Sequence, residues 1–226
     1  AALQSSLRRR ALAMSWKLLL LLLQASGWTI VISATSIVIG LAIGTVVSAA
    51  MLARPRWLSL AGRTFVSFFR GAPLLVQLLL IYNLLPLLGI NVPSIVAAII
   101  GLSLCTAAYQ AENLRGGFAS VPPGLLEAAE MLGLSPLQQF WRIRAPIALR
   151  LTLPALTNEA IMILKASSLV SVVGVVELTR MAQDLAASTF QPLPLFAAAG
   201  LIYLVINTVV ARFAAALERR FRWGRA

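Results

Sequence analysis

Apolar residues fill several long stretches of the chain, and charged residues gather between them. No charged residue occurs from Trp28 to Ala53 or from Gly71 to Ala111. A helix needs about 20 apolar residues to cross a bilayer. The pattern predicts an all-α integral membrane protein with about five transmembrane helices. The expected spans are about 28–52, 64–86, 94–115, 151–176 and 194–214.

The chain begins differently from the rest. Arg8, Arg9 and Arg10 precede the apolar run Leu18–Leu23, which resembles a signal peptide. No clear small-residue cleavage site separates this run from the first span. We therefore expect residues 1–27 to form a basic and apolar N-terminal segment on or partly in the membrane, with a short sixth span as the alternative. The rest of the chain is expected to form a transmembrane domain over 28–216 and a basic cytoplasmic tail over 217–226.

Composition narrows the class of function. The net charge is +12, and only 12% of the residues are charged. The basic residues flank apolar spans, which favours a membrane orientation signal over nucleic-acid binding. The single cysteine, Cys105, allows no disulfide within the chain, and histidine is absent. These absences exclude histidine-based catalysis and most zinc sites, so we expect no metal site. No residue of the chain is predicted to be catalytic.

The distribution of Lys and Arg predicts the orientation. The segment after the first span, the segment between spans three and four, and the tail carry most of the basic residues, whereas the opposite loops hold Arg180 and the N-terminal group. Basic segments stay on the cytoplasmic side. The bias predicts a cytoplasmic C-terminus. It leaves Lys17 and the three N-terminal arginines on the wrong side, which a sixth span would correct.

One polar and amphipathic segment, about 122–146, interrupts the spans. Leu125–Leu132 has helical spacing of its apolar residues, and Gly133 suits a helix C-terminus. Ser135 followed by Pro136 and, three residues on, Gln138 predicts a capped start of a second helix, which we expect to end before Pro146. Periodicity leaves three alternatives: a hairpin on the lipid surface, a hairpin packed under its own spans, or a helix that docks into a groove of a cytoplasmic partner.

The spacing within this segment resembles a known motif. Glu127-Ala-Ala129, Gly133, Ile143 and Pro146 stand at the positions of the EAA loop of ABC importer permeases, although Ala145 replaces the usual leucine. Further stretches are similar to polar amino acid permeases, so the resemblance covers about 28–222. These stretches are Phe69–Gln77, Ala108–Glu112, Arg115–Gly117, Ser120–Pro122, Leu153–Glu159, Leu164–Ser171 and Gly174–Arg180.

The resemblance implies a multi-pass permease subunit of an ATP-driven amino acid importer in the bacterial inner membrane. Polar or cationic amino acids are the favoured substrates. The implied partners are a cytoplasmic ABC ATPase dimer, a second permease subunit that is identical or homologous, an extracytoplasmic amino-acid-binding protein and membrane lipid. No cofactor is expected in this chain, because the partner ATPase would bind ATP and Mg²⁺. The implied ATPase-coupling residues are Glu127, Ala128, Ala129, Gly133, Arg142 and Pro146.

Polar residues inside the apolar spans are candidates for the substrate pathway. Glu159 and Lys165 lie about 120° apart around one helix, so they are poor partners for each other. A charge in the bilayer must face protein or water, and each can either meet a zwitterionic substrate or complete a structural network. Asn158 and Ser168 share the stripe of Lys165. Ser167 and Ser168 can also bond to their own helix, and Gln77 and Tyr109 can line the pathway or satisfy a neighbouring backbone.

Two other classes of function remain as alternatives. An intramembrane enzyme would use a constellation such as Lys165 and Ser168, which are three residues apart on a helix. A channel or secondary transporter would need no cytoplasmic docking element, and the sequence shows no inverted repeat. No GxxxxGK[ST] loop occurs in the sequence, so ATP-driven transport would take its energy from another chain.

Overall fold

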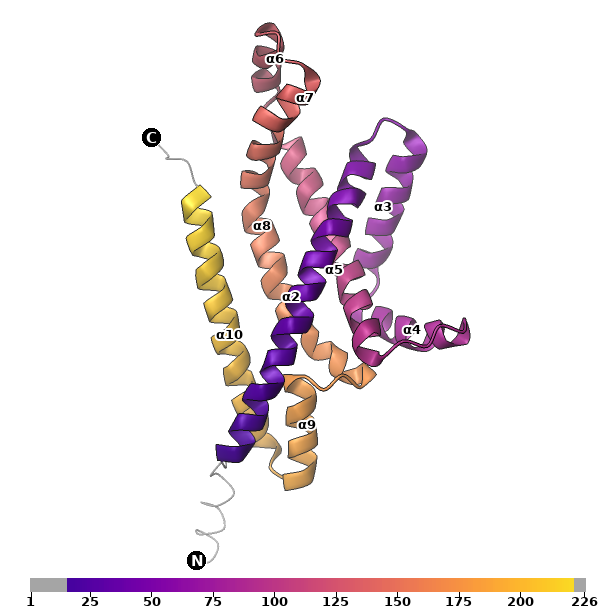
Figure 1. The fold of residues 1–226 in the computed structure, drawn as a ribbon, viewed down its shortest axis with the longest axis vertical. Coiled ribbons are helices and arrows are strands. Elements are labelled where there is room, and N and C mark those ends of the chain that lie inside the picture. The colour runs from indigo at the N-terminus through magenta and orange to yellow at the C-terminus, as the bar shows by residue number, and fades with distance from the viewer. Residues whose placement is uncertain (1–15, 222–226) are drawn as a thin grey trace, which may run out of the picture.

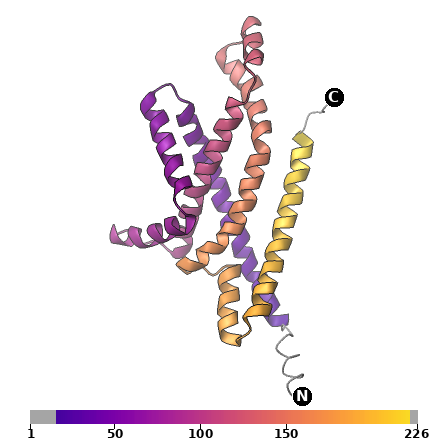
Figure 2. The same ribbon diagram turned by 180° about the vertical axis from the view of Figure 1, so that it is seen from behind.

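The computed structural model describes residues 16–221, and this part of the chain is a bundle of helices joined by short connections (Figures 1 and 2). The predicted all-α membrane fold is confirmed: four helices are long and apolar enough to span a bilayer, or five if one bent pair counts as a span. The elements are α2 (Trp16–Leu52), α3 (Arg56–Gly71), α4 (Leu74–Leu87), α5 (Ser94–Ala119), α6 (Pro123–Met131), α7 (Pro136–Gln139), η1 (Phe140–Arg144), α8 (Ala145–Ala166), η2 (Ser167–Val173), α9 (Leu178–Thr189) and α10 (Pro192–Phe221).

The first helix is longer than the sequence indicates. α2 runs for 37 residues without a break, so residues 16–27 extend the first span and do not form a separate segment or a sixth span. The reason is local, because only Gly27 interrupts the helix formers there, and a single glycine costs about 1 kcal/mol. Residues 1–15, with the three N-terminal arginines, lie outside the described part.

The expected second span is not one straight helix. α3 and α4 meet at a bend of 105°. Pro73 explains the break: it disfavours helical backbone at the preceding residue, and Ala72 is extended with φ −90° and ψ 139°. α4 therefore projects sideways from the bundle, and the chain returns from its outer end toward the bundle, where α5 begins (Figure 1).

α5 lies at the centre of the bundle and contacts α2, α3, α4 and α8. Its approach to α2 is close because α2 places Gly40 and Gly44 on the shared face. A Cβ atom added to Gly40 would lie 2.1 Å from the side chain of Thr106, and one added to Gly44 would lie 2.8 Å from the carbonyl oxygen of Ala107. Small residues at such contacts are the usual means of close helix packing in membranes.

Two further expectations about helix ends are wrong. The second helix of the polar segment does not stop before Pro146; it continues through η1 into α8. In η1 the N–H of Ala145 bonds to the carbonyl of Phe140, five residues back. This wider π turn fits next to a proline, which has no N–H to donate. Likewise α8 ends at Ala166 and continues only as the 3-10 segment η2, which ends at Gly174 with φ 82°.

The charged stretch from Glu177 to Asp184 forms the start of α9. Glu177 is fully buried, and its carboxylate accepts bonds from the backbone N–H of Thr179 and Arg180, both at 2.9 Å. Tyr203 of α10 donates to it at 2.8 Å, and Thr29 of α2 at 3.4 Å. Burial raises the pKa of Glu177, and the hydrogen bonds act against that shift. One carboxylate thus joins α2, α9 and α10.

We expect Gly44→Val to destabilise the bundle, because the added side chain must displace the backbone of α5. Overpacking of this kind costs about 1–3 kcal/mol. Gly27→Val on the same helix is the matched control, since nothing lies within 4 Å of its added Cβ. Thermal unfolding of both variants in detergent gives the comparison. Equal melting temperatures for the two variants would show that the α2–α5 contact is looser than described.

Candidate functional site

The polar segment folds as a helical hairpin at one end of the molecule (Figure 1). α6 ends in a Schellman motif: the N–H of Leu134 bonds to the carbonyl of Ala129 at 3.1 Å, and that of Gly133 to Glu130 at 2.9 Å. Gly133 has φ 74°, as its predicted role requires. Ser135 and Gln138 form the predicted capping box. Both capping predictions are therefore confirmed.

The hairpin exposes a large apolar surface. Met131, Leu132, Leu137 and Trp141 are 89%, 80%, 68% and 67% exposed, and we call these four residues the hairpin apolar surface. Its surroundings are polar, because the side chains of the nearby charged residues are exposed too. Several exposed apolar side chains on one short hairpin indicate an interaction site.

The residues proposed for coupling divide between this surface and its support. Glu127, Ala128, Gly133 and Arg142 are exposed on the hairpin. Ala129, in contrast, is 2% exposed and packs inside, so the two alanines of the motif face different ways. Pro146 belongs to the first turn of α8 and is half-buried.

The hairpin is held firmly to the spans. The Phe140 ring stacks on Phe118 of α5, with centroids 5.8 Å apart and an interplanar angle of 8°. Trp141 touches Phe140 edge-on but remains exposed. Because η1 runs directly into α8, a force on the hairpin acts on α8 without an intervening hinge loop.

Glu159 is enclosed by a polar network between three helices. Its side chain is 5% exposed and accepts a hydrogen bond from Thr106 at 3.3 Å. Gln110 donates to Thr106 at 3.1 Å and to the carbonyl of Ile37 at 3.5 Å. The network joins α2, α5 and α8 within the bilayer, where unsatisfied polar groups are costly.

The neighbours of Glu159 on α8 face outward. Asn158 and Lys165 are exposed, as the expected stripe requires, and Lys165 forms no ion pair with any described carboxylate. Ser167 donates to the carbonyl of Leu164 at 2.7 Å, and Ser168 to that of Lys165 at 2.9 Å. In this conformation both serines bond to carbonyls of their own chain segment, which was one of the two alternatives given for them; the other was a place in the substrate pathway.

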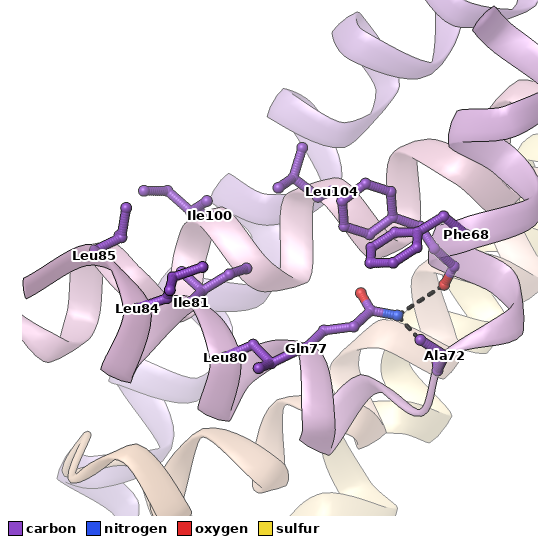
Figure 3. Close-up of a pocket in the computed structure, with 10 residues that line it drawn as sticks. Phe68, Ala72, Gln77, Leu80, Ile81, Leu84, Leu85, Ile100 and Leu104 are labelled. Carbon is purple, nitrogen blue, oxygen red and sulfur yellow. Dashed lines mark hydrogen bonds between the residues drawn. The ribbon is translucent and has the colours of Figure 1, made fainter. Parts of the chain in front are cut away.

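Gln77 holds the bend between α3 and α4. Its amide nitrogen donates to the carbonyls of Phe69 and Ala72, both at 2.8 Å (Figure 3). These bonds satisfy carbonyls at the broken end of α3. The remaining side of Gln77 borders an apolar cavity of about 340 Å³, which is lined by Phe68, Phe69, Ala72, Leu80, Ile81, Leu84, Leu85, Ile100 and Leu104.

Tyr109 has a partner that the sequence did not suggest. The guanidinium of Arg70, at the end of α3, lies 5.1 Å from the centre of the Tyr109 ring. Arg70 lies within the expected span 64–86, and the expected spans gave no indication of this contact. The signal that could have found it is Gly71-Ala-Pro73, a helix breaker directly after Arg70.

These features define a class: a multi-pass membrane subunit with a polar network between its helices and an exposed hairpin that continues directly into one of them. Residues 36–223 match the sequence family described as "Binding-protein-dependent transport system inner membrane component". The chain belongs to this family. It is therefore a permease subunit of ATP-driven importers, and a partner subunit hydrolyses ATP.

Individual relatives of the chain are also permease proteins of transport systems. The chain is 38% identical over 197 residues to the octopine transport system permease protein of Rhizobium meliloti, covering 80% of this chain and 79% of the relative. It is 36% identical over 214 residues to the histidine/lysine/arginine/ornithine transport system permease protein of Salmonella typhimurium, covering 90% and 94%. A crystal structure titled as an amino acid ABC transporter with histidines superposes with a TM-score of 0.84 at 33% identity, covering 88% and 94%.

We expect Glu159→Ala to lower the stability of the bundle, because it leaves Thr106 without its acceptor at a buried contact. Loss of such a partner costs about 1–3 kcal/mol. Asn158→Ala, one residue away on the exposed side of α8, is the control and should change stability little. Thermal unfolding in detergent measures both. If the two variants melted together, the network would not stabilise the fold.

Proposed function

We propose that this permease imports an amino acid and forms half of its translocation pathway. Support comes from the relatives and the solved structure above, whose names and title refer to transport of amino acids or amino acid derivatives. Polar or cationic amino acids are the favoured substrates, because the relatives include a glutamine permease of Escherichia coli (33% identical over 209 residues) and the histidine/lysine/arginine/ornithine permease.

The hairpin apolar surface is the observation that carries the proposed coupling to an ATPase. Such a surface lacks a partner in the described residues, and it continues directly into α8. We assign it to the docking groove of a cytoplasmic ABC ATPase subunit, with Glu127, Ala128, Gly133 and Arg142 at the contact. Ala129 and Pro146 support the contact from inside. ATP and Mg²⁺ belong to the ATPase, since this sequence holds no phosphate-binding loop.

The orientation follows from where basic residues lie. The hairpin, the α2–α3 connection and the end of α10 share one end of the molecule (Figure 1). That end carries Arg54, Arg56, Arg142, Arg144, Arg219 and Arg220. By the positive-inside rule this end is cytoplasmic, together with the C-terminus. The opposite end, with α9, then faces the amino-acid-binding protein.

The exposed polar stripe of α8 supports a substrate pathway along this face of the helix. Asn158 and Lys165 are open on α8, whereas Glu159 is enclosed. We assign Asn158, Lys165 and Tyr109 to the substrate side, and Glu159, Gln77, Ser167 and Ser168 to the framework. A second permease subunit, identical or homologous, covers the stripe and completes the pathway, because a charge exposed to lipid would be costly.

Uptake into proteoliposomes tests the substrate class. The complete complex with its binding protein should import one or more of glutamine, histidine, lysine, arginine and ornithine. Lys165→Met should reduce this uptake at least about tenfold while the complex stays assembled, because an interaction of one charge pair is typically worth that factor. Uptake of none of the five would reject the proposal, and transport of another small solute would identify a different substrate in the same family.

Leu132→Asp tests the docking surface. The buried carboxylate would oppose contact with an apolar groove, so we expect the variant to insert normally but to lose copurification with the ATPase. Leu193→Asp is the matched control: Leu193 is 78% exposed at the opposite end, in the first turn of α10. Retention of the ATPase by the Leu132 variant would move the docking site away from the hairpin.

A further inference from the structure

Arg70 carries a charge at membrane depth. It lies in the last turn of α3, 14 residues after Arg56 at the basic end of the same helix (70 − 56 = 14). At 1.5 Å per residue this separation is about 21 Å, so Arg70 reaches well into a hydrocarbon core about 30 Å thick. The bend at Ala72 follows at once, and α4 then turns sideways. A permanent charge at this depth needs an anion or water.

Within the described part of the chain no carboxylate forms an ion pair with Arg70. Glu112 and Glu159 are near enough to interact with its charge, but each is engaged elsewhere. Glu112 pairs with Arg115, and Glu159 bonds to Thr106. The Arg70 side chain is exposed, so its N–H groups are open to a further acceptor.

Tyr109 fixes the direction from which an acceptor can approach. The Cζ atom of the Arg70 guanidinium lies over the Tyr109 ring, 5.1 Å from the ring centre. The ring therefore covers one side of the guanidinium, whose remaining N–H groups can bind a carboxylate through two parallel hydrogen bonds. The pair is therefore a geometric match for a carboxylate, and less so for a monodentate group.

The position of Tyr109 on α5 determines which face of the helix this pair occupies. Thr106 and Gly117 face α8, and Ala108 and Ala111 pack in the cluster that includes Val66 of α3. At about 100° per residue, Tyr109 falls between these two directions on the side away from α2. Arg70 thus reaches a face of α5 that lies between α3 and α8.

We propose that Arg70, stacked on Tyr109, binds the α-carboxylate of the transported amino acid midway through the membrane. The α-carboxylate is common to all amino acids, so this contact sets the class of substrate, while other groups select the side chain. The inference rests on the proposed amino acid transport. It adds a residue outside the expected pathway set and gives a specific role to Tyr109.

The test compares substrates with and without the carboxylate. The probes are three pairs: arginine and agmatine, histidine and histamine, and glutamine and 4-aminobutanamide. Binding is measured on the permease–ATPase complex in nanodiscs without the binding protein, which would otherwise impose its own selectivity. The variants are Arg70→Gln, Arg70→Lys and Tyr109→Leu. Arg63→Gln, two turns away on α3 and already bonded to Ser59, is the matched control.

We expect the wild-type complex to prefer the amino acid of at least one pair. Arg70→Gln should weaken binding of that amino acid about 10- to 100-fold, the usual worth of charge-assisted hydrogen bonds, and change its decarboxylated analogue less than about threefold. Arg70→Lys and Tyr109→Leu should lose part of the preference, and Arg63→Gln none. A smaller loss in the lysine variant is expected, because it keeps the charge without the bidentate geometry.

Three results would overturn the inference. The preference could survive in Arg70→Gln, or both members of a pair could weaken equally. Alternatively, Arg70→Gln could separate the permease subunits in size-exclusion chromatography while Arg70→Lys assembles with an unchanged preference, which would assign Arg70 to an acidic group of the second subunit. Failure of the proposed function is a distinct outcome, since the wild-type complex would then import none of the amino acids.

Discussion

Every break in a helix within a bilayer leaves backbone groups that water cannot satisfy, and this constraint governs the whole structure. Each interruption is matched by a particular side chain or turn. At the α3–α4 bend, Gln77 bonds to two freed carbonyls. At Pro146 the π turn of η1 accommodates the missing N–H. At the start of α9, Glu177 accepts two backbone N–H groups.

The same breaks give the protein its working parts. Because α3 ends at Ala72, Arg70 stands at a helix terminus inside the membrane and not at its surface. Because the chain passes Pro146 without stopping, the proposed docking hairpin continues into α8 without a loop. The network of Glu159, Thr106 and Gln110 then joins α8 to α5 and α2 at the centre of the bundle.

Much of the site could be anticipated, because its signals are local. The capping box at Ser135 and the left-handed Gly133 depend on residues within one turn of the chain, and both were predicted correctly. Helical periodicity placed Asn158 and Lys165 on one face of α8, and the structure shows that both are exposed. What periodicity left open was whether Glu159 faces substrate or framework, since that depends on Thr106, a residue distant in the sequence.

The sequence by itself determined the class of fold, the number of apolar helices and the hairpin with its caps, because hydrophobic length and capping are properties of short segments. Only the tertiary structure decided the 105° bend, the continuity of the hairpin with α8, the burial of Glu177 and the meeting of Arg70 with Tyr109. The last two depend on contacts between helices that are distant in the sequence. The spacing of residues within one segment carries no information about which other helix packs against it.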